Sequence, residues 1–433
     1  MTDFLALPPA AELRGTLRVP SSKSATNRAL VAAALTGSRV EIAAPLESED
    51  TRALRACLAA MGATFEDSAE GVWVCGPLRG DPGREIVLDV RDSGTAARFL
   101  TAAAAATPGR FLLTGSPRLC ERPMGELIAA LASGGVRTAY RGKDGCLPIA
   151  VEGGRLQSGP LVVDATRSSQ FLSALLLAGV AVEGGLAVRS SGPVASAPYV
   201  RMTIETLREL GHEVHEGELL RVTRGRRITE RLEIGGDYSS AIPFLAAVGA
   251  AGGRVVLTGL RWPSVDADAG VLPVLQEMGV GIAASAAGIV AEAERHALRP
   301  ILVRATDFPD AVPALAGLAA LADGGSRFTG IAHLRLKESD RIAALAALLT
   351  AAGASAAAEA DALTVTGPAR RGGAFARLPT FQDHRIAMAA AILALRMPGM
   401  LIENPECVSK SYPRFFRDLQ SLARRPAHAS SRQ

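Results

Sequence analysis

Apolar and polar positions follow one pattern that recurs six times along the chain. Each copy begins with a short extended run, continues through a small polar turn and enters a helix that is apolar on almost every side. Examples of these alanine-rich helices are Ala29 to Leu35, Ala311 to Ala322 and Ile386 to Leu395. Because a helix that is apolar all round belongs in the interior of a globule, we expect these helices to be buried.

Two landmarks repeat with the same spacing. The polar turns lie 70 to 75 residues apart, at Ser22, Ser93, Ser168, Ser239, Pro309 and Asp383. Glycines close a second, leucine-rich helical pattern at Gly62, Gly135, Gly211, Gly279 and Gly353. Two markers in phase indicate six copies of one unit: strand, turn, buried helix, strand, exposed helix ending in glycine, then strand. A solenoid is less favoured, because this period is longer than that of the usual solenoid repeats.

The repeats predict two lobes of three units each. Residues 1–20 hold one strand-like segment, Leu13 to Val19, ahead of the first turn. The segments near Pro20 and Gly235 are the best places for the chain to cross between lobes. We therefore expect residues 21–237 to form one lobe, and residues 1–20 with 238–433 to form the other, so that the N-terminal strand joins the later repeats.

Composition narrows the class of protein. A hydrophobic content of 48% with 21% charged residues is typical of a soluble globular chain of two or three domains. No apolar run is long enough to span a bilayer and the first residues lack the basic start of a signal peptide, so we expect a cytoplasmic protein with no membrane partner. The formal net charge of +4 is small and dispersed, which argues against nucleic acid. Five scattered cysteines indicate a reducing compartment and no structural metal.

Lysine is rare in this chain. Of 47 basic residues only Lys23, Lys143, Lys337 and Lys410 are lysines. A chain that otherwise uses arginine can retain lysine where a compact ammonium group is required. Lys23, Lys337 and Lys410 lie in polar stretches that stand out for other reasons, whereas Lys143 fits an ordinary surface loop.

The helix starts predict anion binding. Serine, aspartate and glycine are ordinary N-caps when taken singly, but several buried helices starting this way could direct their N-terminal dipoles at one space. Arg28, Arg98 and Arg385 lie in or near such first turns, where a cation opposes the helix dipole. A purely structural sequence would avoid that placement, and an anion site would use it.

Acid and base candidates gather in the fifth and sixth repeats. Lys337 and Arg341 would share one helical face if their segment is helical, and an anionic ligand would offset their repulsion. Glu338 is either an ion-pair partner for them or a general acid. Asp310 opens a helix, and His384 lies at the start of another.

Ten short sequence motifs, taken together and in their order along the chain, resemble those of the enolpyruvyl transferases, most closely the 5-enolpyruvylshikimate-3-phosphate synthase family. The motifs are Ser22-Lys23-Ser24 with Arg28, Ser93-Gly94-Thr95 with Arg98, Leu119 to Met124, Ser168-Ser169-Gln170, Ser196 to Tyr199, Gly236 to Ser240, Pro309-Asp310, Arg335 to Arg341, Asp383-His384-Arg385 and Lys410 to Pro413. The resemblance implies an α/β fold, a two-lobed inside-out α/β barrel of six βαβαββ repeats, with three repeats in each lobe and a cleft that closes on substrates.

The resemblance also implies the reaction. Members transfer the enolpyruvyl group of phosphoenolpyruvate to the 5-hydroxyl of shikimate 3-phosphate, through a tetrahedral ketal that expels phosphate, on the way to chorismate and the aromatic amino acids. Glu338 then matches the acid that protonates the methylene carbon. Asp310, assisted by Lys23, matches the base, and His384 is a further catalytic candidate. No cofactor and no metal is implied, and a monomer is expected.

The substrate residues come from the same resemblance. Phosphoenolpyruvate is assigned to Lys23, Gly94, Arg122, Gln170, Arg341, Arg385 and Lys410. Shikimate 3-phosphate is assigned to Lys23, Ser24, Arg28, Ser168, Ser169, Gln170, Ser196, Tyr199, Asp310, His333 and Lys337. The chain departs from the family pattern at Arg91-Asp92-Ser93, where Gly-Asn-Ala is common. It also departs at Phe99, where proline is common, and at His333, where asparagine is common.

Two alternatives remain open. One is the sister enzyme that acts on UDP-N-acetylglucosamine, which carries a catalytic cysteine in a Pro-Gly-Gly-Cys loop; here Cys120 follows Pro117-Arg118-Leu119 instead. The other is an anion-binding module of the same fold without turnover. Retention of Lys23, Asp310 and Glu338 argues against that alternative.

Overall fold

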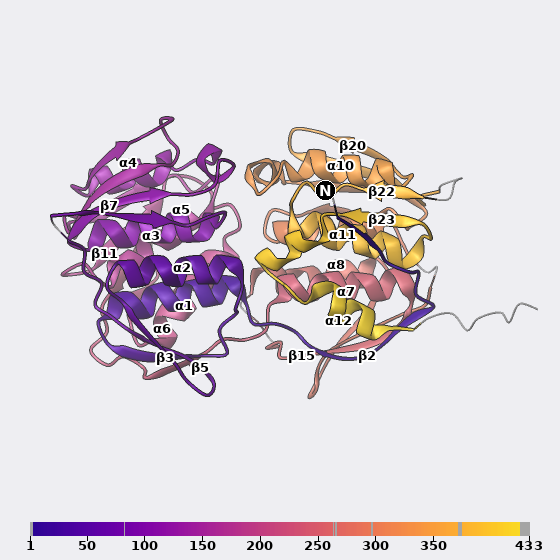
Figure 1. Cartoon of the computed structure of the whole chain (residues 1–433), viewed down its shortest axis with the longest axis horizontal. Helices are drawn as coiled ribbons and strands as arrows, with labels where there is room; N and C mark the ends of the chain where they lie inside the picture. The colour runs from indigo at the N-terminus through magenta and orange to yellow at the C-terminus, as the bar shows by residue number, and fades with distance from the viewer. Residues whose placement is uncertain are drawn as a thin grey trace, which may run out of the picture. The chain divides into compact units, whose positions relative to one another are not determined.

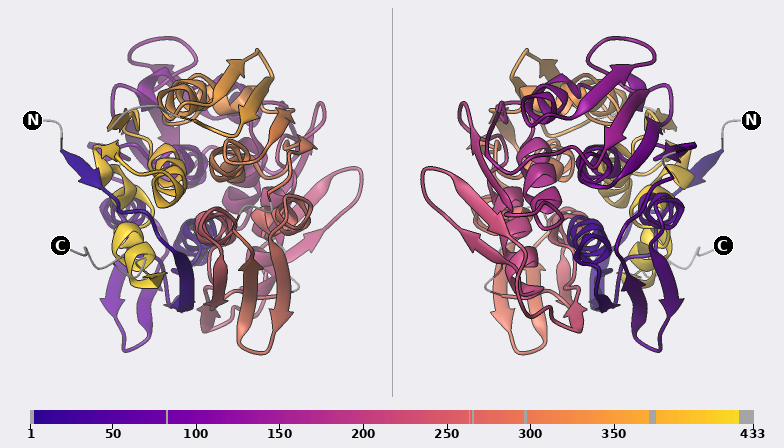
Figure 2. Two further views of the ribbon diagram at one scale, coloured as in Figure 1. Left: turned by 90° about the vertical axis from the view of Figure 1, so that its right-hand side faces the viewer. Right: turned by 90° about the vertical axis from the view of Figure 1, so that its left-hand side faces the viewer.

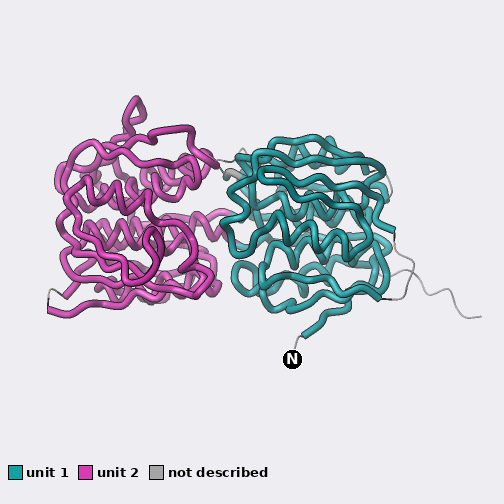
Figure 3. Tube along the Cα trace, turned by 90° about the horizontal axis from the view of Figure 1, so that it is seen from above, with its two compact units in different colours: residues 1–20, 236–433 teal, residues 21–235 magenta. Residues whose placement is uncertain are grey.

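The computed structural model describes residues 3–81, 83–262, 264, 266–295, 298–370 and 375–424. The chain divides into two compact units, which are residues 1–20 with 236–433 (unit 1) and residues 21–235 (unit 2), as Figure 3 shows. The second crossing lies two residues before the expected one. The reason is that the backbone N–H of Asp237 donates to the carbonyl of Pro20 at 2.9 Å and so ties residue 237 to unit 1.

Unit 2 contains three four-stranded sheets with one strand order. In each, the first strand is parallel to the second, and the remaining two strands are antiparallel to their neighbours. The sheets, in spatial order, are β14 (Arg231–Glu233), β3 (Arg39–Ala43), β5 (Gly71–Cys75) and β4 (Thr64–Asp67); β6 (Glu85–Asp89), β7 (Gly109–Thr114), β9 (Ile149–Gly153) and β8 (Arg137–Tyr140); and β10 (Pro160–Val163), β11 (Leu186–Ser190), β13 (Leu220–Thr223) and β12 (Glu213–His215).

Each sheet of unit 2 carries one buried and one half-exposed helix. The buried helices are α1 (Lys23–Thr36), α3 (Gly94–Ala106) and α5 (Ser169–Gly179), which contact one another. The half-exposed helices are α2 (Glu49–Ala60), α4 (Gly125–Ser133) and α6 (Pro198–Glu209). The expectation that the first helix of each repeat is buried is confirmed for this unit.

Unit 1 repeats the plan with a modified last copy. Its sheets, in spatial order, are β16 (Gly281–Ser285), β17 (Gly288–Ala293), β15 (Gly253–Thr258), β2 (Glu12–Arg18) and β24 (Ala423–Arg424); β18 (Leu302–Arg304), β19 (Gly324–Thr329), β21 (Ala362–Gly367) and β20 (Ser355–Ala358); and β1 (Phe4–Ala6), β23 (Met400–Glu403) and β22 (Ala376–Leu378). Its helices are α7 (Tyr238–Ala251), α8 (Leu272–Glu277), α9 (Val312–Ala319), α10 (Arg341–Ala351), α11 (His384–Arg396) and α12 (Phe415–Leu422). Figure 1 labels all of these except α9.

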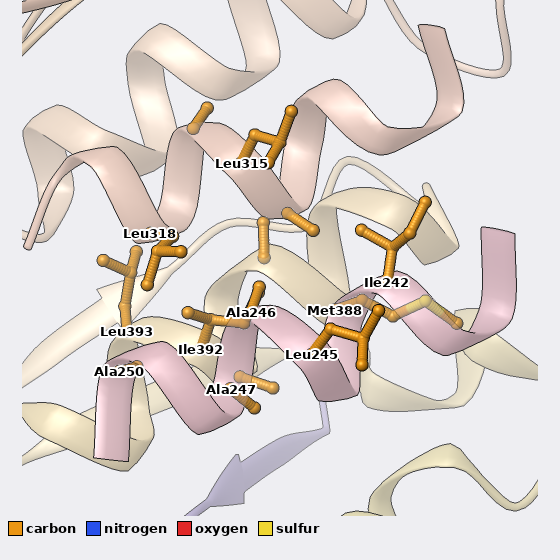
Figure 4. Packing of buried hydrophobic residues seen from close by; sticks show 14 of the residues in the cluster. Ile242, Leu245, Ala246, Ala247, Ala250, Leu315, Leu318, Met388, Ile392 and Leu393 are labelled. Atoms are coloured by element: carbon orange, nitrogen blue, oxygen red, sulfur yellow. The ribbon is translucent and has the colours of Figure 1, made fainter. Parts of the chain in front are cut away.

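The core of unit 1 lies between its three apolar helices. Every residue of α7 and α9 is buried, as are twelve of the thirteen residues of α11. Figure 4 shows Leu245 of α7, Leu315 of α9 and Ile392 of α11 among the side chains that fill the space between these helices. Views along the helices show them nearly end-on, with strands outside them (Figure 2). The fold is therefore α/β, as expected, with helices as the inner layer.

Some sheets are completed by strands that come from distant parts of the chain. β2 pairs in parallel with β15, so the N-terminal strand does join unit 1. The expectation of a single strand in residues 1–20 is wrong, because β1 also forms there and pairs antiparallel with β23. β1 thereby takes the place that β9 takes beside β7, as the antiparallel third strand of the sheet. In unit 2 the returning strand β14 supplies the first strand of the first repeat, parallel to β3.

The repeated glycines all have the backbone conformation that their pattern predicts. Gly62, Gly135, Gly211, Gly279 and Gly353 have φ values of +96°, +87°, +94°, +100° and +90°. Each lies two residues after the last residue of an outer helix, where a left-handed residue commonly ends a helix. Local chemistry therefore sets where each outer helix stops.

Candidate active site

The starts of the inner helices of unit 2 are capped by serine side chains. The hydroxyls of Ser22, Ser93 and Ser168 accept from backbone N–H groups of their own helices at 3.2 to 3.4 Å. Hydrogen bonds also connect neighbouring helix starts, since the amide nitrogen Nε2 of Gln170 on α5 donates to Thr95 Oγ1 on α3 at 3.2 Å. Positive helix ends thus lie beside one another within this unit.

Lys23 begins α1 and forms an ion pair that the sequence did not predict. Its Nζ lies 2.9 Å from Asp50 Oδ2, in the first turn of α2. Both side chains are largely buried, with exposed fractions of 18% and 8%. Asp50 resembles any first-turn carboxylate in the sequence, so only the fold identifies it as the partner of Lys23.

Arg28 is buried between α1 and α6. Its Nε donates to Thr203 Oγ1 at 2.7 Å, and its two Nη atoms donate to the carbonyls of Ser24 and Tyr199 at 2.9 and 3.0 Å. The guanidinium carbon also lies 5.2 Å from the ring centroid of Phe99. Aromatic contact and neutral acceptors hold this cation in one orientation.

Gly94 and Arg122 meet at the start of α3. Arg122 follows a short 3₁₀ turn, Leu119–Glu121, and is 9% exposed. A β-carbon at Gly94 would lie 2.5 Å from Arg122 Nη1, so the guanidinium rests directly against the glycine. Arg98 lies beneath them and donates to the carbonyls of Gly94 and Pro123 at 3.1 and 2.7 Å.

The remaining expected residues of unit 2 lie on α5 and just before α6. Ser168 precedes α5, and Ser169 and Gln170 are its first two residues. Ser196 adopts a left-handed backbone with φ of +54°, which is uncommon for a residue with a side chain, and Tyr199 follows in α6. Such outliers cluster at functional sites.

Arg341 is the centre of the cluster in unit 1. Its side chain is 1% exposed and contacts three carboxylates. Nη1 lies 2.8 Å from Asp310 Oδ1, Nη2 lies 2.9 Å from Glu338 Oε2, and Nε lies 2.8 Å from Asp383 Oδ2. Burial lowers the pKa of the guanidinium, but the three carboxylates outweigh burial and raise it. Arg341 therefore remains charged and holds the acidic groups together.

Lys337 and Arg341 are not on one helix face, contrary to the expectation. Lys337 follows the 3₁₀ turn Ala332–Leu336, and α10 begins only at Arg341. Both cations instead contact the same oxygen, Asp310 Oδ1, at 3.2 and 2.8 Å. Burial opposes ionisation of Asp310, yet Lys337 and Arg341 hold its pKa well below its usual range. Asp310 is the anion that offsets their repulsion.

Glu338 lies between two cations. Besides its contact with Arg341, its Oε1 lies 3.5 Å from Lys410 Nζ at the end of the 3₁₀ turn Pro405–Lys410. The side chains of Glu338 and Lys410 are 16% and 11% exposed. Lys23, Lys337 and Lys410 thus each contact a carboxylate, whereas Lys143 is exposed in its loop.

The two expected histidines of unit 1 are buried to different degrees. Burial, followed by the charge of Lys337, lowers the pKa of His333 to about 4, so its imidazole is neutral at neutral pH. Its Nε2 is shielded from solvent and has no hydrogen-bond partner among the described residues. His384 is 2% exposed, with Nδ1 3.8 Å from Asp383 Oδ1.

Asp383 and Arg385 begin α11. Asp383 is fully buried and caps the helix by accepting from the backbone N–H of Arg385 at 2.9 Å. It also accepts from the hydroxyl of Ser339 at 3.0 Å. Both Nη atoms of Arg385 donate to Ser239, one to its carbonyl and one to its hydroxyl. The roles of Asp383 and Ser239 as partners of these arginines were not predicted, since their partners lie far away in sequence.

Comparison with known proteins identifies the family. A family model described as EPSP synthase (3-phosphoshikimate 1-carboxyvinyltransferase) matches residues 7–419. The chain belongs to the EPSP synthase family. A 3-phosphoshikimate 1-carboxyvinyltransferase of Thermococcus kodakarensis is 40% identical over 417 residues, covering 96% of this chain and 98% of that protein. One of Methanoculleus marisnigri is 38% identical over 404 residues, covering 92% and 94%.

Solved structures of the EPSP synthase family have the same fold. An EPSP synthase from Acinetobacter baumannii superimposes with a TM-score of 0.80 at 27% identity, covering 98% of this chain and 99% of that one. Within the described residues, no helix is both long and apolar enough to cross a membrane. Nor does the described part of the chain gather three or more histidine, cysteine, aspartate or glutamate side chains in a way that could hold a metal ion.

Proposed function

We propose that this member of the EPSP synthase family transfers the carboxyvinyl group of phosphoenolpyruvate to the 5-hydroxyl of shikimate 3-phosphate and releases phosphate. The observation that carries the proposal is that Asp310 and Glu338, the candidate base and acid, are both bonded to Arg341. Lys337 and Lys410 contact the same two carboxylates. One cluster thus contains a proton acceptor, a proton donor and the cations that substrate anions would engage.

Asp310 is the proposed base for the 5-hydroxyl. Its low pKa makes it a weak base while Lys337 and Arg341 contact its Oδ1. When the phosphate of shikimate 3-phosphate takes Lys337 as its partner, that contact weakens and the basicity of Asp310 rises. Substrate binding would thereby prepare the carboxylate to accept the proton.

Glu338 is the proposed acid. Once the anionic groups of phosphoenolpyruvate take Arg341 and Lys410 as partners, the carboxyl of Glu338 can carry a proton. It then protonates the methylene carbon C3 while the 5-oxygen bonds to C2, which gives the tetrahedral ketal. In the second step the bond from C2 to the phosphate oxygen breaks, phosphate leaves with the electron pair, and C3 returns its proton. Arg341 and Lys410, the two cations that contact Glu338, stabilise the leaving phosphate.

The remaining assignments follow the family pattern. In unit 2, Lys23, Gly94, Arg122 and Gln170 would contact phosphoenolpyruvate, and Ser24, Arg28, Ser168, Ser169, Ser196 and Tyr199 would contact shikimate 3-phosphate. In unit 1, Arg341, Arg385 and Lys410 would contact phosphoenolpyruvate, His333 and Lys337 would contact shikimate 3-phosphate, and His384 would assist proton transfer. Side-chain cations supply the positive charge and no redox step occurs, so no cofactor is required.

Cell compartment and assembly are part of the proposal. The five cysteines are free, which suits a reducing cytoplasm. All residues assigned to the two substrates belong to one chain, so a monomer is proposed.

The proposal is tested by asking which acceptor substrate the protein uses. Purified protein is mixed with phosphoenolpyruvate and either shikimate 3-phosphate or UDP-N-acetylglucosamine, and phosphate release is followed. Release with shikimate 3-phosphate alone is expected. Release only with the UDP-sugar would reject the proposal in favour of the sister reaction, and tight binding of shikimate 3-phosphate without turnover would favour an anion-binding module.

A further inference from the structure

Arg385 is a buried cation that forms no ion pair with another described residue. Its side chain is 4% exposed, and no carboxylate oxygen of the described residues lies within ion-pair distance of its guanidinium. Its Nε is shielded from solvent and has no hydrogen-bond partner in the described part of the chain. A charge removed from water in this way is costly unless an anion completes its environment.

Ser239 occupies one edge of this guanidinium. The second residue of α7, Ser239 is 6% exposed, and it accepts from Nη1 with its carbonyl and from Nη2 with its hydroxyl. A guanidinium presents its donors in a rigid plane, so fixing the terminal edge fixes the direction of the Nε edge as well. The Nε edge is the side of Arg385 that retains an unused donor.

The backbone of Arg385 is fixed independently. Its N–H donates to Asp383 Oδ1 at the start of α11, and Asp383 is itself bonded to Arg341. The helices that carry Ser239 and Arg385 pack together through apolar side chains that include Leu245 and Met388 (Figure 4). Asp383 therefore fixes the backbone position of Arg385, and Ser239 fixes the orientation of its guanidinium.

A nearby carboxyl does not replace the missing anion. Asp268 lies close enough to Arg385 to be influenced by its charge, but burial and then Asp266 raise the pKa of Asp268 well above its usual range. Asp310 is also influenced by the charge of Arg385, which together with Lys337 and Arg341 lowers the pKa of Asp310, but its Oδ1 forms ion pairs with Lys337 and Arg341 rather than with Arg385. The anion is expected from a ligand.

We propose that Ser239 is a positioning residue that orients the Nε edge of Arg385 toward an anionic group of phosphoenolpyruvate. This inference rests on the proposed function, which assigns that substrate to Arg385. Ser239 itself touches no substrate in the proposal. Its effect is to keep the guanidinium from rotating, so that the arginine meets the anion without first losing side-chain freedom.

The test compares two adjacent serines. Ser239→Ala removes the hydroxyl that holds Nη2, and Ser240→Ala is its matched control, because Ser240 Oγ donates to Asp237 Oδ2 at 2.5 Å and not to Arg385. We expect Ser239→Ala to raise KM for phosphoenolpyruvate about 10-fold, the scale of one hydrogen bond to a charged group, with KM for shikimate 3-phosphate within about 2-fold. Ser239→Thr keeps a hydroxyl and should restore most of the loss.

Three outcomes would overturn the inference. They are an unchanged KM for phosphoenolpyruvate, a lowered one, and an equal rise in both KM values, as a general loosening of the fold would produce. If Ser239→Ala does not fold, Ser239→Thr and Ser239→Cys provide the comparison. Calorimetric binding of phosphoenolpyruvate to each variant gives the answer without turnover. Failure of the wild-type protein to use shikimate 3-phosphate would instead reject the proposed function.

Discussion

In the cluster of unit 1, a single arginine contacts all three acidic side chains. Arg341 is bonded to Asp310, Glu338 and Asp383 at once, so a change at any of the three alters the environment of the others. Removing one partner of such a buried network leaves an uncompensated charge. Substitutions that keep size and change charge by one unit are therefore the most informative.

Glu338→Gln tests the acid. The amide keeps the shape of the side chain but cannot supply the proton, so we expect turnover to fall by a factor of about 10² or more. Binding of shikimate 3-phosphate, measured by calorimetry, should survive. Glu359→Gln is the control, because Glu359 forms an exposed ion pair with Arg327. Near-normal turnover of the Glu338 variant would remove this residue from the acid role.

Gly94→Ala tests the contact with Arg122. The new β-carbon would lie 2.5 Å from Arg122 Nη1, so the guanidinium must move and KM for phosphoenolpyruvate should rise by about 10-fold or more. Gly125→Ala, at the start of α4, is the control, because the nearest atom to its β-carbon would be 3.7 Å away. Equal KM values for the two variants would show that Arg122 does not bind this substrate.

At the scale of elements, each outer helix is delimited by its own sequence. α2 shows this best, because Ser48 and Thr51 form a capping box in which each side chain bonds the backbone of the other. The same first turn carries Asp50, the partner of Lys23. A local capping motif therefore positions a carboxylate beside a proposed catalytic lysine.

Ser48→Ala should lower the free energy of unfolding by about 1 kcal/mol, the usual cost of removing a serine cap. Urea denaturation followed by circular dichroism measures it. Ser133→Ala, which removes an exposed hydroxyl at the end of α4, should cost less than about 0.5 kcal/mol. If Ser48→Ala and Ser133→Ala lower the free energy of unfolding equally, the capping box does not stabilise α2.

At the scale of the whole molecule, buried histidines make stability depend on pH. Burial, then the charge of Arg224, lowers the pKa of His212 to about 4, and its Nδ1 accepts from the backbone N–H of Gly225 at 3.3 Å. The unfolded chain binds a proton at His212 near pH 6.5, while the folded chain does not until about pH 4. Stability is thus complete above pH 6.5 and is lost as pH falls toward 4.

His212→Asn should flatten this dependence. Asparagine retains an acceptor for Gly225 but does not titrate, so the loss of unfolding free energy between pH 6.5 and pH 4.5 should shrink by about 2 to 3 kcal/mol. Denaturant unfolding at a series of pH values measures the slope. The exposed His215 provides the control as His215→Asn. An unaltered slope in the His212 variant would contradict the assignment.

Much of the architecture is readable from local pattern. The six-fold period, the buried first helices and the glycines that end the outer helices each depend on residues a few positions apart, and the structure contains all three. The exchange of β1 and β14 between repeats was not readable, because a three-residue strand carries too little pattern to name its partner. The repeated pattern in the sequence therefore predicts the fold class. The exchange of strands depends instead on how distant segments pair when each unit closes.

The candidate residues were named in the sequence by their motifs, but their partners were not. Lys23 meets Asp50 across 27 residues, Arg341 meets Asp383 across 42, and Arg385 meets Ser239 across 146. Sequence by itself determined where the inner helices of unit 2 begin and where the glycine-ended outer helices stop, because those signals act over one turn of backbone. Only the tertiary structure decided which charges neutralise one another, because helix starts distant in the chain become neighbours only when the apolar helices pack.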